Sequence, residues 1–214
     1  MKSFSHYLQE TKNVHMTHVE DMVIYGGVAG TRQAINALRD MRDMLAGHQE
    51  GSVSTKWDGA PAIWAGTDPS DGKFFVAKKG VLKKEPEVYK SKEDLDNDTK
   101  LSNDLRKKFT VALKHLPELG IKDVIQGDFL FTREDLKKET IHDEKFITFH
   151  PNTILYAIPV KAAQPLLKSK IGIVWHTSYT TNGKDLKGLK QSFGVNVKKL
   201  NKTKNVWSQD AMLR

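Results

Sequence analysis

A lysine in the segment 54–62 has the surroundings that most clearly favour covalent chemistry. Lys56 stands two residues before the pair Asp58-Gly59, after a short run of β-forming residues and before a Gly-Ala-Pro turn. A lysine amine forms covalent intermediates when its surroundings lower the amine pKa. Burial or a neighbouring cation would lower that pKa, whereas Asp58 alone would raise it. The segment predicts a nucleophilic lysine at a strand end, and the alternative is a solvated lysine in a surface turn.

Three stretches downstream carry residues that could act with this lysine. Lys78-Lys79 is a basic pair before a glycine, and Gly127-Asp128 interrupts an apolar run where a strand would otherwise be regular. Tyr156 lies in a later apolar run. Each stretch also has a structural interpretation, because surface lysines, a bulge carboxylate and a core tyrosine are all common.

In order and spacing, these residues resemble the motifs of the covalent nucleotidyltransferases, which include ATP-dependent DNA ligases, RNA ligases and mRNA-capping enzymes. Lys56-Trp57-Asp58-Gly59 resembles their Lys-x-Asp-Gly signature, whose lysine attacks the α-phosphate of a nucleoside triphosphate. The chain is most similar to the smaller, RNA-ligase-like members, over roughly residues 50–160. Small divergent members of this kind are often encoded by large tailed phages.

The resemblance implies a role for each of these residues. Lys56 would be the catalytic nucleophile and would form a lysyl-AMP intermediate with ATP. The nucleotide-binding residues would be Thr55, Asp58, Gly59, Lys78, Lys79, Asp128 and Tyr156. Asp128 would also contact the ribose or a hydrated Mg²⁺ that bridges the phosphates. Tyr156 would offer a ring face to the base, and Lys78 or Lys79 would supply charge that favours a neutral Lys56 amine.

The chain departs from the family pattern at three places. Asp128 stands where the family usually has Glu, and Ile171 stands where the next strand should carry Glu before Gly. A final Lys-x-Lys strand has candidates only in the basic segment 197–204. These departures predict a core that is incomplete at its C-terminal end. They leave open a catalytically incomplete module that binds nucleotide or nucleic acid, and a structural protein that has reused the fold.

The composition limits the partners and the compartment. Lys and Arg outnumber Asp and Glu by 34 to 26, and the net charge of +8 favours a polyanion such as RNA or DNA ends. The chain has no cysteine, which excludes disulfides and thiolate metal sites. No apolar run approaches the roughly 20 residues that span a bilayer. We therefore expect a cytoplasmic protein without a membrane partner, in the host cell if the chain is phage-encoded.

The hydrophobic periodicity predicts the elements that position these residues. A turn at 25–32 should lead into a helix capped near Thr31, and a second helix over 101–116 should end at Pro117. The apolar residues that should turn the first helix toward a core are Ala34, Ile35, Leu38, Met41, Met44 and Leu45. Strands are expected at 61–66, 73–78, 124–131, 146–149, 153–160 and 171–175.

These elements predict an α+β fold with antiparallel sheets flanked by helices. With the resemblance, we expect a ligase-type nucleotidyltransferase (ATP-grasp-like) core with a nucleotide cleft between its sheets. The expected division is a helical segment at 1–48 packed on the core, a nucleotidyltransferase-like core at 49–180, and a basic C-terminal segment at 181–214.

Overall fold

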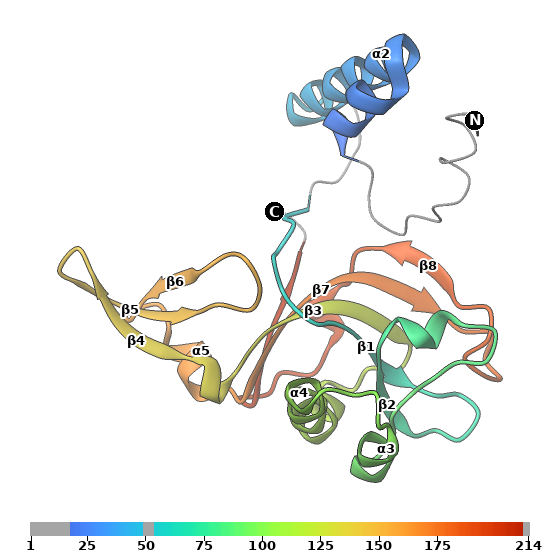
Figure 1. Cartoon of the computed structure of the whole chain (residues 1–214), viewed down its shortest axis with the longest axis vertical. Helices are drawn as coiled ribbons and strands as arrows, with labels where there is room; N and C mark the ends of the chain where they lie inside the picture. The colour runs from blue at the N-terminus through green and yellow to red at the C-terminus, as the bar shows by residue number, and fades with distance from the viewer. Residues whose placement is uncertain (1–17, 49–53, 212–214) are drawn as a thin grey trace. The chain divides into compact units, whose positions relative to one another are not determined.

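The computed structural model describes residues 18–48 and 54–211, drawn in colour in Figure 1. The chain divides into two compact units, residues 1–52 and residues 53–214. Among the described residues, no helix is both long and apolar enough to cross a membrane.

The first unit contains one long helix, α2 (Val19–Leu45), which is kinked at Gly27. Gly27 has φ 55° and ψ −145°, a conformation open to glycine because it has no Cβ. Beyond the kink, a Cβ on Gly30 would lie 2.0 Å from the Met22 carbonyl oxygen, so the two parts of the helix approach closely there. The predicted turn is this kink. The prediction of a cap at Thr31 is wrong, because its hydroxyl donates to the Gly27 carbonyl within the helix (2.9 Å).

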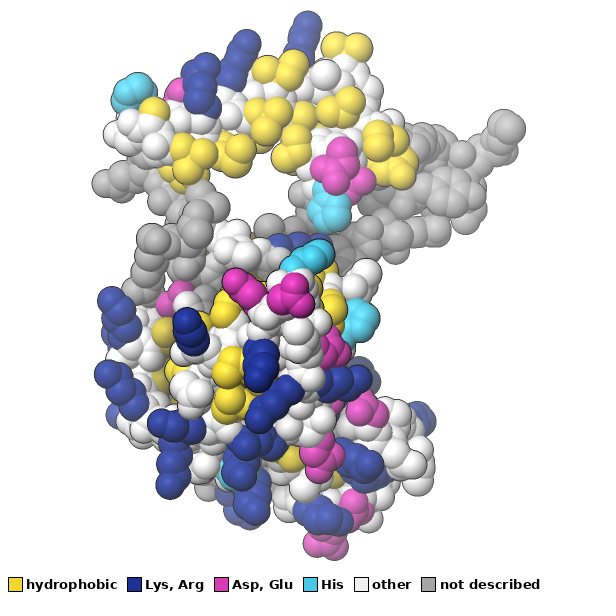
Figure 2. Space-filling model, turned by 90° about the vertical axis from the view of Figure 1, so that its left-hand side faces the viewer, with side chains coloured by type: hydrophobic (Ala, Val, Ile, Leu, Met, Phe, Trp, Pro, Cys, Tyr) yellow, Lys and Arg dark blue, Asp and Glu magenta, His cyan; other side chains and the backbone are white. Residues whose placement is uncertain are grey.

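The apolar stripe of α2 is exposed within this unit. Ala34 is buried, but Ile35, Leu38, Met41 and Leu45 are 44% to 67% exposed. Figure 2 shows apolar side chains gathered along this helix. The periodicity therefore predicts the helix correctly, whereas the described part of the unit forms no core that covers this stripe.

The second unit is built on a six-stranded sheet with the order β2-β1-β3-β7-β8, in which β9 also pairs with β7. Its strands are β1 (Ala62–Thr67), β2 (Phe74–Ala77), β3 (Val124–Thr132), β7 (Ile171–Thr180), β8 (Lys190–Phe193) and β9 (Val206–Asp210). All pairs are antiparallel except β7 with β9, which is parallel. The hairpin expected at 61–66 and 73–78 is confirmed by β1 and β2.

Two helices, α3 (Lys92–Asn97) and α4 (Asn103–His115), lie on one face of this sheet (Figure 1). Phe109 and Leu116 are fully buried against sheet residues such as Ile63 and Trp175. After α4, the short 3₁₀ turn η2 (Leu116–Leu119) ends at Gly120, which adopts the left-handed conformation typical of a helix C-terminus. The predicted end of the second helix is confirmed.

A smaller antiparallel sheet contains β4 (Lys137–Ile141), β5 (Glu144–Phe149) and β6 (Tyr156–Pro159). The hairpin between β4 and β5 turns at His142 and Asp143, which both have positive φ, as a tight two-residue turn requires. The short helix α5 (Gln164–Lys168) then leads back to β7. The α+β class with antiparallel sheets and helices is thus confirmed, with one parallel pair. Residues 190–193 and 206–210, within the expected basic segment, are strands of the main sheet.

Candidate active site

The segment that carries Lys56 is fixed to the main sheet at both ends. The Thr55 N–H donates to the Ala211 carbonyl (2.7 Å), just after β9. At the other end, the Ala60 N–H donates to the Phe129 carbonyl (2.9 Å), and the Phe129 N–H donates to the Pro61 carbonyl (3.0 Å). Because both ends are bonded to backbone, Lys56 and Asp58 have a defined position on the sheet.

Gly59 brings this segment into direct contact with β3. A Cβ on Gly59 would lie 2.6 Å from the Asp128 Cβ and 2.9 Å from the Phe129 carbonyl oxygen. Only glycine permits so close an approach without a shift of the backbone. Asp128 is thereby placed directly beside the Lys-x-Asp-Gly segment.

Asp58 connects the segment to the loop between β5 and β6. Its Oδ1 accepts a hydrogen bond from the Asn152 side-chain amide (2.7 Å), and its Oδ2 accepts from the N–H groups of Thr153 (2.6 Å) and Ile154 (2.7 Å). The Asp58 N–H donates to the Tyr156 hydroxyl (2.8 Å). These donors, Asn152 first, hold the pKa of the Asp58 carboxyl below its usual value, because hydrogen bonds stabilise the charged form. Asp58 therefore anchors a loop that is distant in sequence.

Tyr156 belongs to an aromatic cluster beside Lys56. Its ring stacks on Trp57, with centroids 5.5 Å apart, and on Phe149, with centroids 5.1 Å apart. Trp57 also meets the edge of Trp207 at 6.3 Å. In this structure Tyr156 thus packs against two protein rings, and its use as a platform for a base stays a prediction.

The Lys56 side chain is exposed and makes no ion pair with a described residue. Its charge contributes to the low pKa of the Asp58 carboxyl, but less than the hydrogen bonds to Asp58 do. The neighbours of Lys56 in sequence are both fixed, Thr55 through its backbone and Trp57 through its ring. The amine is therefore an accessible group on a well-positioned segment.

Asp128 faces a histidine that the sequence patterns did not predict. The His176 Nε2 lies 3.7 Å from the Asp128 Oδ1, and the His176 Nδ1 lies 2.8 Å from the Thr177 hydroxyl. The register of β3 with β7 shifts here, since Gln126 pairs with Thr177 but Gly127 pairs with Trp175. His176 is the extra residue of this bulge, and bulges often re-aim a side chain. The sequence offers no signal for it beyond a lone histidine in an apolar run.

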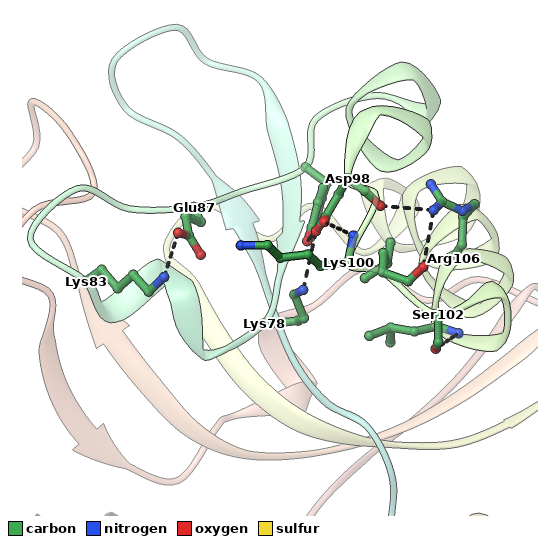
Figure 3. Close-up of polar contacts among 10 residues, drawn as sticks. Lys78, Lys83, Glu87, Asp98, Lys100, Ser102 and Arg106 are labelled. Carbon is green, nitrogen blue, oxygen red and sulfur yellow. Dashed lines mark hydrogen bonds and ion pairs between the residues drawn. The ribbon is translucent and has the colours of Figure 1, made fainter.

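Lys78 is engaged elsewhere. Its Nζ lies 3.4 Å from the Asp98 Oδ2 and over the Tyr89 ring, 5.7 Å from the centroid. Figure 3 shows Lys78 turned toward Asp98, whose backbone carbonyl also accepts from Arg106 (3.0 Å). Burial acts to lower the pKa of Lys78, but the interactions with Tyr89 and Asp98 outweigh it, and the pKa is raised. Lys78 is therefore held as a cation within a polar cluster next to α4.

The structure thus brings together some of the predicted site residues and not others. Asp58 contacts Tyr156, and Gly59 lies against Asp128, all within reach of the Lys56 segment. Lys79 is exposed at the start of the 3₁₀ turn η1 (Lys79–Leu82), after β2. The contacts that define this site do not include Lys78 or Lys79.

The fold and the site define an α+β protein in which a lysine-bearing segment, a carboxylate on a central strand and an aromatic cluster meet at one place. Comparison with known families places the chain in one of them: residues 13–213 match the family of unknown function DUF6267, to which the chain belongs. No curated protein and no solved structure matches the chain.

Proposed function

We propose that this protein is an ATP-dependent nucleotidyltransferase of the polynucleotide ligase type, with Lys56 as its nucleophile. The Lys56 Nζ attacks the α-phosphorus of ATP; the new N–P bond forms as the bond to pyrophosphate breaks, and the amine proton leaves to solvent. A 5′-phosphate oxygen of RNA or DNA then attacks the same phosphorus. The N–P bond breaks, and the lysine amine recovers a proton.

The contact between Gly59 and Asp128 carries this proposal. Two motifs that lie far apart in sequence meet within van der Waals distance, and a side chain at Gly59 would prevent it. A nucleotide held here would meet the lysine-bearing segment, the Asp128 carboxylate and closely packed backbone. Precise placement of reacting groups is a large part of catalysis.

The hydrogen bonds to Asp58 also support the proposal. Three donors hold its carboxylate in place, namely the Asn152 amide and two backbone N–H groups. Asp58 is therefore committed to positioning the loop 152–154 against the segment that carries Lys56, and the lysine keeps a fixed backbone position.

The residues present fit a magnesium ion that arrives with the nucleotide. Mg²⁺ usually keeps several waters and binds through one or two carboxylates together with substrate phosphates. Within the described ranges, no group of three or more His, Asp or Glu side chains could hold a metal by itself. Asp128 is the carboxylate that would hold the ion, which would neutralise phosphate charge in the transition state.

One observation favours a second candidate, a module that binds nucleotide or nucleic acid without transfer. Ile171 is fully buried among apolar residues of the core, at the position where a transferring enzyme of this type would carry a glutamate. Such a module would keep the site geometry and lack self-labelling.

The two candidates are separated by incubation with ATP labelled on its α-phosphate and Mg²⁺, followed by a denaturing gel. The proposal expects a labelled band for the wild type and for Lys138→Ala, an exposed lysine on β4, and none for Lys56→Ala. Equal labelling of all three proteins, or no labelling of any, contradicts it. Nucleotide binding without labelling is the result expected for the non-transferring module. A parallel lane with GTP tests the choice of base.

A further inference from the structure

A second feature of this unit is a basic pocket of about 450 Å³ beside β9. It lies between α5, η2 and the segment 197–208. Four lysines line it: Lys168, Lys198, Lys202 and Lys204. Its other walls include the apolar side chains of Leu119, Pro165, Val197 and Leu200. The pocket thus combines positive charge with an apolar interior.

The lysine-bearing loop is held by η2. The Thr203 hydroxyl donates to Glu118, and the Asn205 side-chain amide donates to both Glu118 oxygens at 2.9 and 3.0 Å. The Asn201 N–H donates to the Leu119 carbonyl (2.9 Å). With Thr203 anchored, the flanking Lys202 and Lys204 are both exposed. The loop therefore presents its lysines from a fixed backbone.

The residues that the structure describes do not neutralise these lysines. None of the four forms an ion pair with a described residue, and no Asp or Glu lines the pocket. By contrast, Lys78 and Lys90 each face a carboxylate. Unpaired cations around a concave site are complementary to a phosphate chain.

Two indoles in contact link a wall of the pocket to the segment that carries Lys56. Trp207 lines the pocket, and its edge meets the ring of Trp57, the residue next to Lys56. Aromatic and apolar surface between cations suits an unstacked base with phosphates on either side. A duplex keeps its bases stacked inside, so it would use the charge but leave the apolar interior empty.

We infer that this pocket binds a single-stranded stretch of DNA or RNA and leads its end toward Lys56. An unstacked base occupies the apolar interior, and its neighbouring phosphates contact Lys168, Lys198, Lys202 and Lys204. The inference rests on the proposed function for the destination of the strand. Its binding step needs neither ATP nor an active Lys56.

The test measures fluorescence anisotropy of labelled oligo-dT, oligo-U and a matched DNA duplex over a series of salt concentrations. The pocket variant changes all four lysines to Gln. The control variant makes the same charge change at exposed lysines on or near the small sheet: Lys137, Lys138, Lys145 and Lys161. Equal thermal midpoints for the two variants verify that both fold.

We expect the pocket variant to bind single strands on the order of tenfold or more weakly than the control. Its slope of log K against log salt should fall by up to about 3, since each lost phosphate contact to a single strand removes about 0.7. Wild type should prefer single strands to the duplex. Tighter binding of oligo-dT than of oligo-U would identify DNA as the preferred nucleic acid, and the reverse would identify RNA.

Three outcomes would overturn the inference. The first is equal weakening of strand binding in both variants, and the second is duplex binding as tight as single-strand binding. The third, tested with anionic lipid vesicles as a further probe, is a pocket variant that loses binding to vesicles but keeps binding to oligonucleotides. Lys56→Ala separates this inference from the proposed function. If that variant binds strands like wild type while no protein labels with ATP, the pocket inference stands and the transfer proposal fails. If the wild type labels with ATP but strand binding does not depend on the pocket lysines, the transfer proposal stands and the pocket inference fails.

Discussion

In the sequence, the segment 56–59 and the pair Lys78-Lys79 both carry lysines that could act on a nucleotide. In the structure, the surroundings of these lysines differ. The residues that flank the first segment, Thr55 and Ala60, are bonded to the main sheet, and its Asp58 is bonded to the loop 152–154. These contacts leave the Lys56 side chain exposed. Lys78, in contrast, faces Asp98 and packs over Tyr89. A charged residue in a motif can thus be engaged by local ion pairs, whereas a lysine between fixed neighbours can stay accessible.

The largest expected effect concerns Asp58. Asp58→Ala removes the acceptor of three hydrogen bonds and frees the loop 152–154 from the lysine segment. We expect lysyl-AMP formation to fall by about 100-fold, because a small misplacement of a reacting group has an effect of that size. The initial rate of self-labelling measures it. Asp123→Ala removes an exposed carboxylate elsewhere and should label at the wild-type rate; equal rates for both variants would show that Asp58 positions nothing.

The contact between Gly59 and Asp128 is tested by Gly59→Ala. The new methyl group would meet the Asp128 Cβ and the Phe129 carbonyl, so the backbone must shift. Overpacking of this kind should cost about 1–3 kcal/mol of unfolding free energy, measured by urea denaturation. The matched control is Gly26→Ala in α2, where nothing lies within 4 Å of the added atom. A stability loss at both positions, or at neither, would contradict the close packing of Gly59 against β3.

A smaller effect on stability distinguishes Lys78 from Lys79. Lys78→Met breaks the ion pair with Asp98, and because both groups are partly solvated the loss should be about 0.5–1 kcal/mol. Lys79 has no ion-pair partner among the described residues, so Lys79→Met should leave stability unchanged. Paired urea titrations measure the difference. If Lys79→Met is the more destabilising of the two, the assignment of Lys78 to the polar cluster is wrong.

The smallest expected effect is on stability in acid. It concerns two carboxylates, Asp58 in the Lys56 segment and Asp98 opposite Lys78. Hydrogen bonds, chiefly from Asn152, lower the pKa of Asp58, and a hydrogen bond from Tyr89 is the main cause of the lowered pKa of Asp98. Both groups are easier to ionise when folded, so their stabilisation is present above about pH 4 and is lost as pH falls through the folded pKa. Asp58→Asn and Asp98→Asn should each flatten the fall in urea midpoint between about pH 6 and pH 3. An unchanged slope in both variants would contradict these shifts.

Much of the fold follows from local patterns in the sequence. The hairpin of β1 and β2, the strand β3 and the helix α4, which is followed by η2 and Gly120, all have periodic apolar residues and clear turn signals. Strands β4 and β8 lack such a pattern, since nearly every residue of β4 and every residue of β8 is exposed, and only pairing with a neighbour defines them. Pairing partners are a tertiary property that a single-sequence pattern does not encode.

The candidate site shows the same limit. The glycine of the Lys-x-Asp-Gly segment marks a close approach, but the sequence does not say that the approached residue is Asp128. The hydrogen bonds of Asp58 to a loop more than 90 positions away, and the bulge that turns His176 toward Asp128, depend on strand register. The basic segment 197–204 is weakly patterned in sequence because its structure comes from contacts with Glu118 and Leu119.

In the proposed reaction, Lys56 accepts the nucleotide. Peptide mapping by mass spectrometry tests this after incubation of the wild type with ATP and Mg²⁺ at neutral pH, with quenching in base to preserve a phosphoramidate. We expect one adenylyl group on the peptide that contains Lys56, and its disappearance when a 5′-phosphorylated single strand is added. An unmodified Lys56 peptide, or an adenylyl group on another lysine, would show that Lys56 is not the nucleophile.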